Sequence, residues 1–235
     1  MALSPMIKAD IERRSQTRPV TVIPNMSDVQ YFRPGPKNQE LENLYGLSGK
    51  FVVSYVGAIG FANGLDFIID CARATRQAGM PVHYLLCGDG AMLEHLKNAV
   101  TRHALPNITF VPFQTREGVR QVLGVTDAAL ICYRPVPILE TGSPNKYFDA
   151  LAAGKLIFIN FSGWLKQEVE AEQCGFYLSP ANPSAITALI KPFLIHREEL
   201  TLFQRRSRSL AERKYTRVQL GDAFVKLVEA KALSV

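Results

Sequence analysis

The sequence lacks the features of a membrane-spanning or secreted protein. It has no run of about 18 apolar residues, the minimum for a helix that crosses a bilayer. Residues 1–18 carry acidic side chains and no long apolar core, so they do not resemble a secretory signal peptide. We therefore expect a cytoplasmic protein, and peripheral contact with the inner face of a membrane is a further expectation.

The cysteines lack the spacing of a disulfide framework or a zinc site. They are widely separated, none belongs to a Cys-x-x-Cys pair, and no pair of histidines lies near them. We expect buried, reduced thiols, no metal site and no cofactor. The four residues are Cys71, Cys87, Cys132 and Cys174.

Charge and composition are moderate and exclude two broad classes. A net charge of +6 and a pI of about 9.2 suit phosphorylated ligands or an anionic membrane, but they are too small to indicate a nucleic-acid partner, and no DNA- or RNA-binding motif is present. The chain has no repeat or low-complexity tract. With 235 residues, 47% of them hydrophobic, it can build a core and is not disordered.

From Lys50 onward, apolar strands alternate with glycine-containing loops and amphipathic helices. Such repeated units predict an α/β fold with a parallel sheet and helices on both faces. Strands are expected at 51–56, 82–87, 108–111, 128–133, 156–160 and 175–178. Helices are expected at 65–77, 92–103, 116–122, 143–154 and 165–172, with C-terminal helices at 184–195, 198–213 and 217–231.

We divide the chain into three parts. Residues 1–49 form a connector, with a helix at 4–14, a strand at 19–23, a turn at 24–28 and, at 37–49, a loop that can hold one helical turn. Residues 50–182 form the main domain, and residues 183–235 form C-terminal helices. A basic run in the second of these helices fits either anionic lipid head groups or a solvated face; it comprises Arg205, Arg206, Arg208, Arg213 and Lys214.

The stretch 140–154 carries the clearest ligand signal. We expect Ser143 to cap a helix, Pro144 to be its first residue and Gly154 to end it. A helix N-terminus offers unpaired N–H groups to a phosphate, and Gly142 lets a ligand approach the backbone.

Two polar residues of this helix lie three positions apart and therefore on one face. Lys146 would contact a phosphate and Asp149 a ribose hydroxyl. The alternative is an ordinary capped helix on which the two form a solvated ion pair.

Four loops would open on the same edge of the sheet, where ligands bind in such folds. They are 57–64, 88–90, 112–115 and 140–146. The spacing of Gly57, Gly60 and Gly64 matches neither a dinucleotide fingerprint nor a P-loop, so each glycine loop also fits plain turn chemistry.

An ordered series of motifs resembles glycosyltransferase family 4, and more narrowly its bacterial enzymes of O-antigen and capsule synthesis. The motifs are 22–28 with Phe32, 55–57 with 63–65, 86–90, 107–110, 126–127, 143–146 with 149–154, and 172–175. The resemblance implies a GT-B fold, in which two Rossmann-like domains flank a cleft, and this chain resembles the second, donor-binding domain. Residues 4–11 resemble the end of the first domain, so we expect the acceptor domain to lie outside this sequence or on a separate polypeptide.

The resemblance also implies residue roles. Asp149 matches the family's ribose-binding acidic residue, with Asp in place of Glu. The acidic residue that contacts the donor sugar is expected at Thr141, whereas this sequence has Glu140 one place earlier. The positions of the family's diphosphate-binding Arg and Lys hold Ala58 and Asn63.

The remaining donor contacts follow from the same resemblance. The loop N–H groups of Gly142 and Ser143, together with Lys146, would neutralise the diphosphate, and the backbone at Phe113 and Gln114 would contact the base. The expected catalytic residues are Lys146 and Glu140, and the expected donor-binding residues are Gly57, Gly60, Asn63, Gly88, Phe113, Gln114, Thr141, Gly142, Ser143 and Asp149.

The implied reaction moves a hexose-type sugar from a nucleotide diphosphate, with UDP expected, to a saccharide or lipid-linked acceptor with retention. A non-catalytic nucleotide-sugar sensor or scaffold is an alternative, because the first glycine loop lacks the usual cations. A sugar-nucleotide epimerase is a third candidate, weakened by the absence of carboxylates or histidines placed for proton abstraction.

Overall fold

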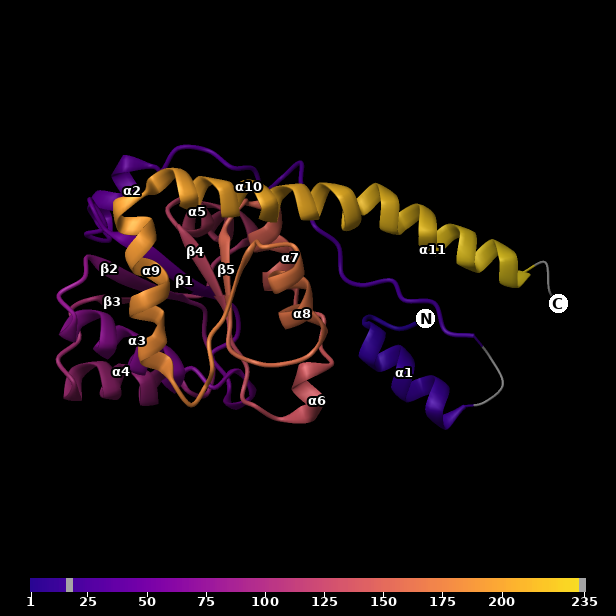
Figure 1. Ribbon diagram of the computed structural model, residues 1–235, viewed down its shortest axis with the longest axis horizontal. Helices are drawn as coiled ribbons and strands as arrows, with labels where there is room; N and C mark the ends of the chain where they lie inside the picture. The colour runs from indigo at the N-terminus through magenta and orange to yellow at the C-terminus, as the bar shows by residue number, and fades with distance from the viewer. Residues whose placement is uncertain (16–18, 233–235) are drawn as a thin grey trace.

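The computed structural model describes residues 1–15 and 19–232, and it centres on one parallel sheet (Figure 1). The strand order is β3-β2-β1-β4-β5-β6, and all pairs are parallel. The predicted α/β fold is therefore confirmed. The strands are β1 (Phe51–Val56), β2 (Val82–Cys87), β3 (Ile108–Val111), β4 (Ala128–Ile131), β5 (Leu156–Ile159) and β6 (Gly175–Tyr177).

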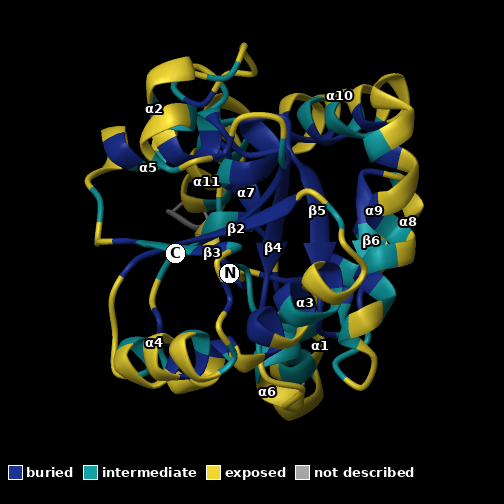
Figure 2. Cartoon of the chain, turned by 90° about the vertical axis from the view of Figure 1, so that its left-hand side faces the viewer, coloured by how far each residue is buried: buried dark blue, intermediate teal, exposed yellow. Residues whose placement is uncertain are grey.

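Helices cover both faces of the sheet because successive strand residues point to opposite sides. Val53 packs in the cluster that includes α3 (Asp66–Gln77), α4 (Leu93–Arg102) and α9 (Ile186–Ile195). Residues on the other face pack against α5 (Arg116–Gly124), α7 (Asn145–Ala152) and α8 (Trp164–Ala171). Figure 2 shows the buried strands between helices whose outer faces are exposed. Short helices are η1 (Phe61–Asn63), α6 (Pro137–Glu140) and η2 (Pro183–Ala185).

The C-terminal helices are α10 (Arg197–Lys214) and α11 (Arg217–Ala232), and α11 extends beyond the sheet domain (Figure 1). Several basic side chains of α10 are bonded to carbonyl or carboxylate oxygens of this same chain. Arg208 donates to the carbonyl oxygens of Val29 (2.9 Å), Phe32 (2.8 Å) and Ala152 (2.5 Å). Arg213 pairs with Glu172 at 2.6 Å, and Lys214 pairs with the same carboxylate at 2.8 Å. These side chains fasten α10 to the domain rather than forming a free cationic face.

The N-terminal segment departs from two expectations. Helix α1 (Pro5–Arg14) forms with Ser4 as its cap, and α2 (Gln39–Leu44) lies in the predicted loop. The strand predicted at 19–23 is wrong, since among the described residues Val22 forms only an isolated bridge with Ala2. This segment lies between two prolines and does not join the sheet, so Val20 and Ile23 are buried without a strand ladder. The turn predicted at 24–28 begins instead at Asp28, whose carbonyl accepts from the Tyr31 N–H at 3.2 Å.

All four cysteines are free and buried, as predicted. Within residues 1–15 and 19–232, no helix has the length and apolar character needed to cross a bilayer.

Candidate functional site

Two adjoining cavities lie at the carboxyl ends of the central strands, where the predicted loops meet. The larger has a volume of about 340 Å³ and the smaller about 230 Å³. They share Val56, Gly57, Ala58 and Val119, so together they form one groove. Three of the predicted loops, 57–64, 88–90 and 112–115, and the end of 140–146 line this groove.

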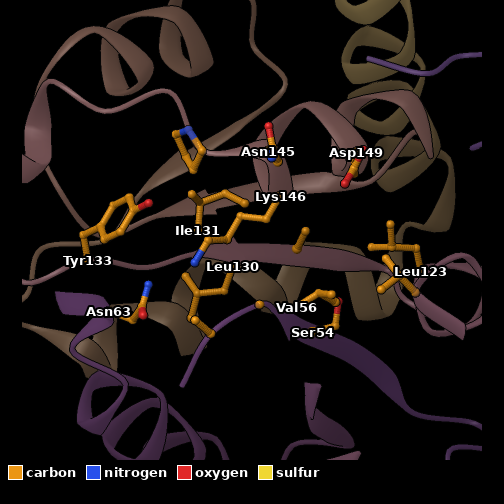
Figure 3. Close-up of a pocket in the computed structure, with 15 residues that line it drawn as sticks. Ser54, Val56, Asn63, Leu123, Leu130, Ile131, Tyr133, Asn145, Lys146 and Asp149 are labelled. Carbon is orange, nitrogen blue, oxygen red and sulfur yellow. The ribbon is translucent and has the colours of Figure 1, made fainter. Parts of the chain in front are cut away.

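Lys146 supplies the positive charge of the larger cavity (Figure 3). Its ammonium donates a 2.7 Å hydrogen bond to the Tyr55 hydroxyl and lies 4.2 Å from the centre of that ring. The Tyr133 ring is 5.1 Å away. No carboxylate of the described residues lies within ion-pair distance, and burial lowers the Lys146 pKa to about 8. A partly buried cation held by aromatic groups is available to an anionic ligand.

Asp149 lies one helical turn after Lys146 and lines the same cavity. Burial raises its pKa to about 6, and the negative charge of Asp28 adds to this effect while Arg116 opposes it. No ion pair joins Lys146 to Asp149, so the alternative of a solvated pair is wrong. The helix instead presents a cation and a carboxylate at separate points of one groove, an arrangement that can hold a phosphate and a hydroxyl-bearing group together.

The glycine loops are shaped mainly by contact with each other. Gly57 donates to the Cys87 carbonyl at 2.9 Å, and a Cβ on Gly88 would lie 1.9 Å from the Gly57 carbonyl oxygen. Gly88 also has a φ of +147°, which L side chains rarely adopt. Glycine is therefore required at Gly88 for backbone packing, as the turn-chemistry alternative predicts. The packed loops nevertheless form the wall of the smaller cavity.

The groove contains four more of the predicted donor-binding residues. Asn63 lines the larger cavity, its side chain lies beside Lys146 in Figure 3, and it is buried. Phe113 and Gln114 line the smaller cavity together with Gly88. Gly60 lines a neighbouring cavity instead.

The segment before α7 differs from expectation. The helix is capped by Pro144 without a side-chain hydrogen bond, so Ser143 is not its N-cap; the Ser143 hydroxyl accepts instead from the Asn25 N–H at 3.3 Å. The Gly142 N–H donates to the Leu139 carbonyl at 3.3 Å and is not free for a phosphate, which corrects the expected role of that group.

The two candidate sugar contacts stand at the end of α6. Glu140 is the last residue of α6, and the Thr141 hydroxyl donates to the Ile138 carbonyl at 2.8 Å. Neither residue lines the two cavities, nor do Gly142 and Ser143. The sequence did not predict α6, a four-residue helix that begins at Pro137.

Two aromatic residues of the site were missed from the sequence. Tyr55 was placed in a buried strand and in a family motif but was given no role at the site, yet its hydroxyl is the hydrogen-bond partner of Lys146. Tyr133, just beyond β4, lines the larger cavity. A tyrosine near the carboxyl end of a strand, next to a glycine loop, is the signal that could have indicated both. Across the described ranges, no three His, Cys, Asp or Glu side chains gather as a metal site.

Comparison with known proteins agrees with this architecture. The profile of the family described as "Glycosyl transferases group 1" matches residues 50–195. The protein of Escherichia coli (strain K12) named as the colanic acid biosynthesis glycosyl transferase WcaI is 25% identical over 152 residues, which is 63% of this chain and 37% of that protein. The alpha-D-kanosaminyltransferase of Streptomyces kanamyceticus is 23% identical over 96 residues, 40% of this chain and 25% of that protein.

Solved structures share the fold. Anabaena Alr3699/HepE in complex with UDP-glucose superposes with a TM-score of 0.83 at 18% identity, covering 97% of this chain and 63% of HepE. The C-terminal domain of a group 1 glycosyl transferase (LpcC) from Francisella tularensis superposes with a TM-score of 0.67 at 16% identity, covering 81% of this chain and 98% of that domain. The chain thus spans only part of the length of both curated relatives. Because the family profile covers more than half of it, the chain belongs to the group 1 glycosyl transferases.

Proposed function

We propose that this chain is the nucleotide-sugar-binding half of a retaining glycosyltransferase of family 4, with a UDP-hexose as donor. The observation that carries the proposal is the placement of Lys146 and Asp149 on one face of α7, both lining one groove at the carboxyl edge of the sheet. The complex of the HepE neighbour with UDP-glucose supports UDP as the nucleotide.

In the proposed complex, the pyrophosphate lies at the Lys146 ammonium and the ribose hydroxyls donate to the Asp149 carboxylate. The N–H groups of Asn145 and Lys146, in the first turn of α7, have no carbonyl partner within the helix and can donate to a phosphate oxygen. The base occupies the smaller cavity between Gly88 and Phe113. Glu140 and Thr141 remain the candidates for the donor sugar.

In this proposal, the nucleotide-sugar-binding half of the enzyme stabilises the departing diphosphate. A positioned cation and helix N–H groups act on the charge that develops as the glycosidic bond breaks. We infer that a second Rossmann-like domain supplies the acceptor site, and that the acceptor is a saccharide or a lipid-linked saccharide. The name of the WcaI relative, which refers to colanic acid biosynthesis, supports a role in surface polysaccharide synthesis.

Calorimetric titration with UDP tests the binding part of the proposal. Replacing Lys146 with Ala should cost roughly 1.5–3 kcal/mol of affinity, the scale of a charge-assisted hydrogen bond. The matched control is Lys191→Ala, an exposed lysine on α9, which should bind UDP as the wild type does. Unchanged affinity in a folded Lys146→Ala protein would remove Lys146 from the site.

A non-catalytic nucleotide-sugar module is the second candidate. It is favoured by the residues at the family's usual diphosphate-binding positions, since Ala58 and Asn63 both line the groove and neither is cationic. Transfer of radiolabelled sugar from UDP-sugar, measured after candidate first-domain polypeptides are added, separates the two functions. Transfer of the sugar supports the glycosyltransferase. Binding of UDP without transfer, whichever first-domain polypeptide is added, supports the non-catalytic module.

A further inference from the structure

A cavity of about 290 Å³ lies at the opposite edge of the sheet from the groove. Lys155 immediately precedes β5, so the cavity that it lines lies beside the amino end of that strand. The other walls are the segment at Pro34 and Gly35 and one face of α10. The groove opens at the carboxyl ends of the strands, so this cavity is separate from it.

Lys155 is a buried residue whose ammonium has no bonded partner among the described residues. The residue is only 6% exposed, and its backbone bonds to Ala150 and Ser207, whereas its ammonium makes no hydrogen bond or ion pair within the described part of the chain. The adjacent Asp127 carboxylate attracts it, but Asp127 is already bonded to Lys37 at 2.6 Å and contacts Arg197 at 3.5 Å. Burial of the residue lowers the pKa of Lys155 to about 8, so its charged form is disfavoured, and an anion beside the ammonium would offset that cost.

A second cation on the same cavity is also unengaged. Arg205 reaches the cavity from α10 and has no hydrogen bond, ion pair or ring contact with the described residues. The other arginine of the lining, Arg208, is fully used by backbone carbonyls and by Glu212, whose carboxylate is 2.7 Å away. The one acidic residue of the lining is therefore already paired, and the cavity keeps a surplus of two positive charges.

We propose that this cavity is a second ligand site, which binds a phosphate-monoester anion between Lys155 and Arg205. The guanidinium can donate two parallel hydrogen bonds to the anion, and the ammonium adds a point charge. The hydroxyl groups of Thr201 and Ser209 lie on the same wall. The phosphate belongs either to a small soluble metabolite or to a lipid head group.

An anion in this cavity would connect three parts of the fold. It would contact α10, the residue that begins β5 and the segment at Pro34 and Gly35, which Arg208 already ties to α10 through the Phe32 carbonyl. Binding should therefore make the whole chain more resistant to unfolding, because the ligand binds only the folded state.

Titration of the ¹⁵N-labelled chain with inorganic phosphate, followed by NMR, tests the site. We expect saturable shifts of the Gly35 and Gly154 amides and about tenfold weaker binding in Lys155→Met and in Arg205→Gln. Lys191→Gln is the matched control and should bind as the wild type does. The titration is also run with the Lys146→Ala variant, which lacks the cation of the groove. Shifts that persist in this variant come from the second cavity, so this test does not depend on whether the proposed donor site is correct.

Three results would overturn the proposal: no saturable shift at Gly35 and Gly154, shifts that both variants leave unchanged, or shifts that disappear in the Lys146→Ala background. Sedimentation with phosphatidylcholine vesicles, with and without phosphatidic acid, identifies the source of the phosphate. Arg205-dependent binding only to vesicles that contain phosphatidic acid supports the lipid source. Shifts with soluble phosphate and no vesicle binding support the metabolite.

Discussion

The Lys146 ammonium donates a 2.7 Å hydrogen bond to the Tyr55 hydroxyl, which in turn donates to the Ala58 carbonyl at 2.6 Å. The first residue belongs to α7 and the second to β1, so the bond crosses the groove between two elements. Because the hydroxyl proton is used by Ala58, the oxygen is oriented to accept from Lys146. The cation is thus positioned before any ligand arrives.

Tyr55→Phe tests this positioning. The substitution keeps the ring beside the ammonium but removes the hydroxyl that orients it, so UDP affinity should fall by about 0.5–1.5 kcal/mol. Calorimetry measures the change. Tyr177→Phe on β6 is the control and should leave affinity unchanged; equal losses in the two variants would count against a positioning role for Tyr55.

Lys146→Met should stabilise the ligand-free protein while it weakens donor binding. The folded-state pKa of Lys146, about 8, lies below its ordinary value of 10.5, so the charged form destabilises the folded state at neutral pH. Removing the charge should raise the free energy of unfolding by about 1–3 kcal/mol at pH 7 after the lost hydrogen bond is deducted. Urea denaturation measures the difference.

The low pKa of Lys146 also predicts how the stability of the folded protein changes with pH. Between about pH 8 and 10.5 the unfolded chain binds more protons at Lys146 than the folded chain, so the stability of the wild type rises with pH in that range. The difference in the free energy of unfolding between Lys146→Met and the wild type should therefore become smaller above pH 8. A difference in the free energy of unfolding that stays constant above pH 8 would show that the ammonium is not the source of the destabilisation.

Binding of UDP-glucose should be strongest between about pH 6 and 8. Asp149 has a pKa raised to about 6 and must be ionised to accept from ribose, and Lys146 loses its charge above about 8. The donor's pyrophosphate diester takes up no proton in this range, so the protein sets both limits. Asp149→Asn should remove the acid limit in a calorimetric pH series; a limit that persists in this variant would assign it to another group.

Arg208→Met should unfold at a lower temperature than the wild type. The guanidinium satisfies carbonyl oxygens of Val29, Phe32 and Ala152, and their loss of a partner should cost about 2–4 kcal/mol. Calorimetric unfolding checks this, with Arg206→Met as the control because Arg206 makes a single 3.5 Å hydrogen bond to Gln173. Similar melting temperatures for Arg208→Met and the wild type would show that the carbonyls find other partners.

The sheet could be predicted because each strand is a short apolar run followed by a turn and an amphipathic helix. All six strands form where that pattern indicated them. The segment at 19–23 has a similar apolar pattern but no neighbouring strand, and apolar alternation alone does not reveal whether a pairing partner exists.

The candidate site could be predicted in part. The shared face of Lys146 and Asp149 follows from helical spacing, which is local. The partner Tyr55 is 91 residues away in the chain, and nothing local indicates which strand end a lysine will reach. The Ser143 cap was wrong because Asn25, from the distant N-terminal segment, bonds to its hydroxyl.

A crystal structure of the chain with UDP is the most direct test of the proposed donor site. We expect the pyrophosphate within hydrogen-bond distance of the Lys146 ammonium and the ribose hydroxyls at the Asp149 carboxylate. UDP bound away from α7, or a groove that stays empty at saturating UDP, would contradict the account.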